Sequence, residues 1–128
     1  MYKEVAEFTE SCEKCEIYSG FRHQHELHPT FSPTINFKWI VDIVAMPTGI
    51  RQKKYLVLAR EDLTNQIEGW ALGRKMCSTV CQFLLDEVSC RYGCVGQVIA
   101  DRGELESDKA RGFFAKHRVW LTLTTATI

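Results

Sequence analysis

With 128 residues, the chain is long enough for one ordinary domain and too short for two. Hydrophobic residues make up 45% of it, which suffices for a core and excludes a chain disordered as a whole. Sixteen basic residues balance sixteen acidic ones, so net charge does not indicate a nucleic-acid partner. No apolar run is long enough for a membrane span, and the N-terminus has acidic residues where a signal peptide is apolar. We therefore expect a soluble, intracellular protein without membrane contact.

The chain divides near Pro29 and Pro33 into two parts of different composition. Residues 1–33 are polar and rich in cysteine and histidine, whereas residues 34–128 alternate apolar runs with amphipathic stretches. The second part has the pattern of a folded domain.

Three strands are expected first in the second part. Residues 37–46 (FKWIVDIVAM) are apolar and β-branched and are followed by Pro-Thr-Gly, which predicts a buried strand. Residues 55–59 predict a second strand and residues 66–72 a third, with turn-forming residues at 62–65 between them. Such short connections favour an antiparallel meander.

The pattern then changes to helix–strand alternation. Apolar residues recur at helical spacing within residues 74–92, and Gly93 ends the run. Residues 95–100 predict a strand that leads into Asp101. Ser107 can cap the next helix, and residues 119–125 predict a final strand. The apolar positions of the two helices are expected to be Met76, Val80, Phe83, Leu84 and Val88, then Ala110, Phe113, Phe114 and His117. This order indicates an α/β domain with a mixed sheet.

Six cysteines occur in the chain, in two settings. Four lie in or just after the first expected helix, where small buried apolar side chains are the favoured interpretation: Cys77, Cys81, Cys90 and Cys94. The other two form Cys12-x-x-Cys15, which is half of a zinc site, because zinc usually takes four ligands in two closely spaced pairs. A local site that uses two of His23, His25 and His28 is one alternative, and an unmetallated motif is the other.

Two aspartates are candidate metal ligands. Asp42 lies within an otherwise apolar strand, where a carboxylate needs a partner, a metal or exposure at a strand end. Asp101 lies where the fourth strand passes into a glycine-containing loop, a favoured place for functional side chains. Carboxylates on adjacent strands could share Mg²⁺, which supports phosphoryl transfer. Two structural aspartates at strand ends are the alternative.

Small basic clusters are a third feature, and they include Lys53 and Lys54, then Arg74 and Lys75. Each could be a solvated loop or helix end. They would gain a role in holding a phosphate backbone only if they flanked the aspartate pair.

Taken in order, these segments resemble one family. The Cys-x-x-Cys motif, HELHP and FKWIVDIVAMP are similar to the junction between the zinc-binding and catalytic domains of gypsy-type LTR retrotransposon integrases, particularly fungal ones. KKYLVLAREDLTNQIEGWAL, FLLDEVSCRYGCVGQVIADRGELES and FFAKHRVWLTLTTA resemble successive parts of their catalytic core. The resemblance extends from Ser11 to Ala126.

The resemblance implies a ribonuclease-H-like fold and metal-dependent cutting and joining of DNA during DNA integration in the nucleus. It implies that Asp42 and Asp101 are catalytic and hold Mg²⁺ or Mn²⁺, while the family's third carboxylate, a glutamate, has no counterpart here. It also implies zinc at Cys12 and Cys15, but the family's upstream His-His pair is missing.

We therefore expect residues 1–33 to be a remnant of the zinc-binding region and residues 34–128 a partial catalytic core that is inactive as this fragment. Such a fragment should expose an apolar face of its sheet and self-associate. It should bind DNA weakly at most. The alternatives are a non-catalytic nucleic-acid-binding or interaction remnant of a transposable element, and a zinc module appended to an unrelated domain.

Overall fold

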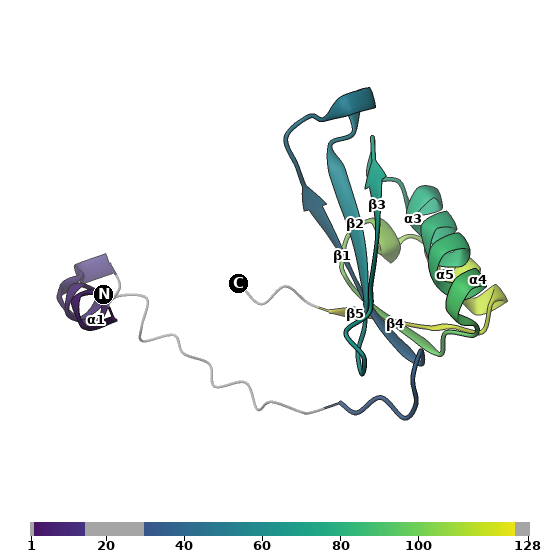
Figure 1. Cartoon of the computed structure of the whole chain (residues 1–128), viewed down its shortest axis with the longest axis horizontal. Helices are drawn as coiled ribbons and strands as arrows, with labels where there is room; N and C mark the ends of the chain where they lie inside the picture. The colour runs from purple at the N-terminus through teal and green to yellow at the C-terminus, as the bar shows by residue number, and fades with distance from the viewer. Residues whose placement is uncertain (1, 15–29, 125–128) are drawn as a thin grey trace. The chain divides into compact units, whose positions relative to one another are not determined.

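The computed structural model describes residues 2–14 and 30–124 (Figure 1). Contacts divide the chain into two compact units, Met1–Thr30 and Phe31–Ile128. In the first unit, α1 (Tyr2–Ser11) is a helix that the sequence analysis did not predict. Its Tyr2, Val5 and Phe8 side chains are exposed.

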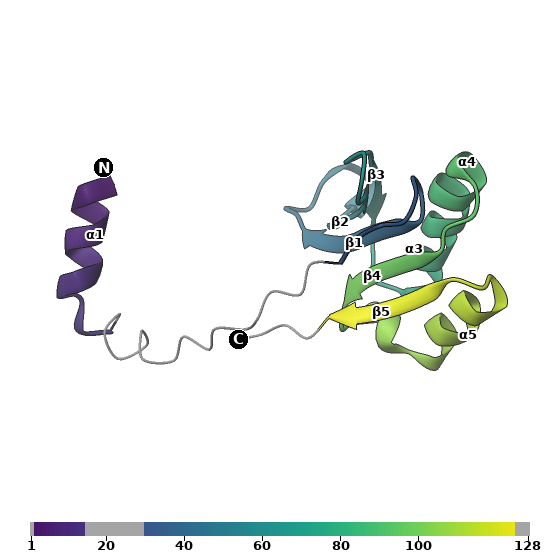
Figure 2. The same ribbon diagram turned by 90° about the horizontal axis from the view of Figure 1, so that it is seen from below.

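The second unit is built on one five-stranded mixed sheet. The strands are β1 (Lys38–Ala45), β2 (Tyr55–Glu61), β3 (Ile67–Leu72), β4 (Gln97–Asp101) and β5 (Trp120–Thr124), in the order β3-β2-β1-β4-β5. The first three form the expected antiparallel meander. β4 then pairs in parallel with β1, and β5 pairs in parallel with β4 (Figure 2). The α/β class with a mixed sheet is therefore confirmed.

The helices of the second unit come after β3 and β4 in the sequence. After β3, a helical stretch runs through α3 (Cys77–Phe83), a π-helical segment (Leu84–Ser89) and α4 (Cys90–Tyr92). After β4 come a 3-10 turn (Glu104–Glu106) and α5 (Asp108–Lys116), and another 3-10 turn (Ile50–Gln52) joins β1 to β2. As predicted, the Ser107 hydroxyl caps α5 by accepting a hydrogen bond from the Ala110 N–H at 3.3 Å.

The helices cover one face of the sheet (Figures 1 and 2). Alternate strand residues point to this face and form a buried core with Val80, Phe83, Leu84, Val88, Ala110 and Phe114. The opposite face carries Ile40, Leu58 and Ile99, which are only half-buried, and Trp120, which is 73% exposed. This face, which we call the open sheet face, is thus only partly covered by the part of the chain that the structure describes.

Two residues predicted to be buried in the core are exposed, because α3 begins after Met76 and α5 ends before His117. Met76 is 50% exposed, since it precedes α3 as its N-cap residue. His117 is exposed because it follows α5 as its C-cap residue. Cys81 is buried and Cys77 half-buried, but Cys90 and Cys94 are exposed near the end of the helical stretch, where Tyr92 is the residue that packs on Trp39 of β1.

Candidate functional site

The parallel pairing of β1 with β4 brings the two candidate aspartates together. Val41 pairs with Ala100, and Asp42 and Asp101 are the next residues on the two strands. Neighbouring strands lie about 4.8 Å apart, and residues in register point to the same face. β1 and β4 are therefore neighbours, as an ion shared by the two aspartates would require. By alternation, both carboxylates lie on the side of the sheet opposite the helices.

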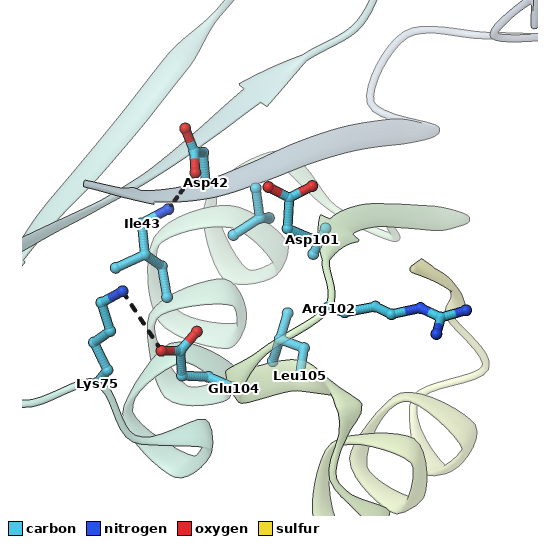
Figure 3. A pocket seen from close by; sticks show the side chains of 9 residues that line it. Asp42, Ile43, Lys75, Asp101, Arg102, Glu104 and Leu105 are labelled. Carbon is cyan, nitrogen blue, oxygen red and sulfur yellow. Dashed lines mark hydrogen bonds and ion pairs between the residues drawn. The ribbon is translucent and has the colours of Figure 1, made fainter. Parts of the chain in front are cut away.

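A pocket of about 180 Å³ surrounds this pair (Figure 3). It lies where β1 and β4 approach their carboxyl ends and is lined by Val41, Asp42, Ile43, Lys75, Ala100, Asp101, Arg102, Glu104 and Leu105. The charged lining residues therefore include two cations from outside the strands. With Asp42, Asp101 and Glu104, the lining carries three carboxylates against these two cations, so its charge favours a bound cation.

Each aspartate is exposed and only partly engaged. The Ile43 N–H donates to Oδ1 of Asp42 at 2.8 Å, and the Thr124 hydroxyl donates to Oδ1 of Asp101. Within residues 2–14 and 30–124, the second oxygen of each carboxylate accepts no hydrogen bond. These oxygens are suitable ligands for Mg²⁺ or Mn²⁺, which keep several waters when bound to one or two carboxylates. The residues present therefore fit such an ion.

Glu104 also lines the pocket but does not complete a three-ligand set. It forms an ion pair with Lys75 at 3.8 Å between Oε1 and Nζ. In Figure 3 this pair lies on the other side of β1 from the Asp42 carboxylate. No group of three acidic, histidine or cysteine side chains able to hold a metal occurs in the described ranges. Glu106, the other nearby acid, lines a different pocket.

The predicted basic residues gather at the same end of the sheet. The Lys54 N–H donates to the Leu72 carbonyl at 2.9 Å, and the Lys54 carbonyl accepts from the Met46 N–H at 2.8 Å. Lys54 and its neighbour Lys53 thus lie between the ends of β1 and β3. Arg74 and Lys75 directly follow β3, and Lys75 enters the aspartate pocket.

Arg102 is a lining residue that the sequence analysis missed. Arg102 belongs to no basic cluster in the sequence and is a single cation directly after Asp101. Its position beside a candidate ligand was the available signal.

The expected zinc half-site is only partly described. Cys12 is half-buried just after α1, whereas Cys15, His23, His25 and His28 lie outside the described residues. The zinc site therefore stays a prediction.

The chain matches no protein-family model and no curated protein. None of the helices in the described part of the chain is both long and apolar enough to cross a membrane.

Proposed function

We propose that Phe31–Ile128 is a ribonuclease-H-like catalytic core of the retrotransposon-integrase type. The observation that carries the proposal is the β1–β4 register, which places Asp42 beside Asp101. An antiparallel meander followed by two parallel strands supports it, as does the resemblance of the sequence to gypsy-type integrases.

The site suits a divalent cation and a phosphodiester substrate. Asp42 and Asp101 would hold Mg²⁺ or Mn²⁺, and the ion would activate an attacking oxygen and stabilise a leaving one. Lys75 and Arg102 also line the pocket, and their charges would favour binding of a phosphate backbone around it. DNA is then the proposed partner, with the nucleus as the place of action.

A second candidate function is nucleic-acid binding without catalysis. It is favoured by the absence of a third ligand among the residues described, because two carboxylates fix a metal less firmly than three. Small misplacements of reacting groups can reduce a rate on the order of a hundredfold. We therefore expect this chain to bind metal weakly and to show no strand transfer or 3′-end processing.

The test is a Mn²⁺ titration followed by electron paramagnetic resonance of the free ion. Asp42→Asn and Asp101→Asn should each weaken binding by on the order of tenfold or more. Asp86→Asn is the matched control, since Asp86 is exposed on the helical stretch and its side chain already accepts an amide N–H from Gln82.

Strand transfer on a labelled duplex with Mn²⁺ separates the two candidates. Activity that disappears in Asp101→Asn would support catalysis and contradict the expected inactivity. Equal Mn²⁺ binding by all four proteins would contradict the metal site itself.

A further inference from the structure

A second depression lies directly beside the aspartate pocket. It has a volume of about 410 Å³ and is lined by Arg102, Glu106, Arg111, Leu121 and Leu123. Because Arg102 lines both spaces, the two are adjacent. In Figure 3 the Arg102 side chain extends away from Asp101, out of the aspartate pocket. We call this depression the edge groove.

The edge groove is formed along the last strand of the sheet. Leu121 and Leu123 belong to β5, which is an edge strand, and both are half-buried. Glu106 comes from the 3-10 turn and Arg111 from α5. The groove thus lies between the sheet edge and α5, on the helix side of the sheet, with an apolar floor and charged walls. The aspartate carboxylates lie on the other side, and the two spaces meet at Arg102, just after the carboxyl end of β4.

The charges of the edge groove favour an anion. Arg102 and Arg111 are both exposed, and neither forms an ion pair within the part of the chain that the structure describes. A guanidinium group can contact a phosphate through two parallel N–H donors. Glu106 is the single acidic lining residue, so the lining has an excess of positive charge.

We propose that the edge groove binds the phosphate backbone of the nucleic-acid strand whose scissile phosphate lies at Asp42 and Asp101. Arg102 would contact the strand where it leaves the aspartate pocket, and Arg111 would contact it further along. Lys54, Arg74 and Lys75 lie at the end of the meander, so cations would flank the aspartates on both sides. This inference rests on the proposed function and extends it by naming the path of the substrate.

A peptide strand could instead pair with the free edge of β5. Two features favour nucleic acid: the edge groove adjoins the aspartate pocket, and it is lined by two arginines. A peptide that pairs through its main chain would need neither the pocket nor the arginines.

The experiment measures fluorescence anisotropy of a labelled single-stranded oligonucleotide with the full chain, in EDTA and over a range of salt concentrations. Arg102→Gln and Arg111→Gln should each weaken binding about threefold to tenfold at ~0.1 M salt and lower the salt slope by about 0.7. Glu106→Gln should strengthen binding, since it removes the opposing charge. Lys109→Gln is the matched control, because Lys109 is also exposed on α5 but lies outside the groove lining, and its effect should be smaller than those of the arginine variants.

Arginine variants that bind as Lys109→Gln does would overturn the proposal. Variants that alter self-association while leaving oligonucleotide binding unchanged would assign the groove to protein contact and overturn it too. EDTA removes divalent ions, so this test does not depend on metal binding. A negative result here would therefore not contradict the metal site, and a negative Mn²⁺ titration would not contradict the edge groove.

Discussion

Glu61 is a fully buried carboxylate that ties three parts of the second unit together. Its Oε1 accepts from the Asn36 N–H at 3.1 Å, ahead of β1. Its Oε2 accepts from the N–H groups of Leu63 and Thr64 and from the Thr64 hydroxyl, in the β2–β3 turn. Burial raises the pKa of Glu61, but the hydrogen bonds from Thr64, Asn36 and Leu63 outweigh it, so the net pKa is lowered.

This balance predicts acid-sensitive stability. A lowered folded-state pKa stabilises the fold above the ordinary glutamate value of 4.5, and that contribution is lost as pH falls through the folded-state pKa. Glu61→Gln should lower the free energy of unfolding at pH 7 by about 1–3 kcal/mol and flatten its decline in acid. Urea denaturation at pH 7, 5 and 3 measures both effects.

The control is Glu106→Gln, in which an exposed carboxylate is replaced, and its unfolding free energy should stay within about 0.5 kcal/mol of the parent. Parallel pH profiles for the parent and Glu61→Gln would contradict the role assigned to Glu61.

At the scale of elements, Gly96 lies where three segments meet. Its N–H donates to the Phe37 carbonyl at 2.9 Å, and its carbonyl accepts from the Trp120 N–H at 2.8 Å. A Cβ at this position would lie 2.2 Å from a ring carbon of Phe37. A side chain at residue 96 would therefore require the Phe37 ring to move.

Two glycine substitutions should change stability in opposite directions. Gly96→Ala forces Phe37 to move and should lower the free energy of unfolding by about 1–3 kcal/mol. Gly112→Ala, in α5, meets no atom within 4 Å and should raise it by about 0.5–1 kcal/mol, because alanine favours the helix. Thermal unfolding of the parent and both variants measures these changes in stability. If Gly96→Ala were as stable as Gly112→Ala, the Phe37 ring would be able to accommodate a Cβ at residue 96 without loss of stability.

Local patterns in the sequence predicted the strands, the meander and the Ser107 cap. The Asp42–Asp101 adjacency needed one more step, the parallel placement of β4 beside β1, which the α/β order implied. Burial of individual helix residues could not be predicted in the same way. The exposure of Cys90 and Cys94 depends on how the end of the helical stretch packs on the sheet, which is a tertiary property. The edge groove was missed for a similar reason, since Arg102 and Arg111 meet only in the folded chain.

At the scale of the whole molecule, the open sheet face should promote self-association. Trp120 is 73% exposed there, and contiguous exposed apolar side chains favour association. Trp120→Ser should lower the weight-average mass measured by sedimentation velocity at high protein concentration. Ile50→Ser is the control, because Ile50 is 89% exposed but lies in the β1–β2 connection. Equal association of both variants with the parent would show that this face is not the contact surface.

The parallel β1–β4 pairing also has a kinetic consequence. β1 can pair with β2 through a short connection, whereas its pairing with β4 must close a loop that contains β2, β3 and the α3–α4 stretch. Contacts between residues distant in sequence form late, because the entropy of loop closure must be overcome first. The meander should thus form early in refolding, and Asp42 should meet Asp101 only when β4 docks. Binding of a divalent ion by both aspartates would then occur only after β4 has paired with β1, because Asp42 and Asp101 lie on different strands.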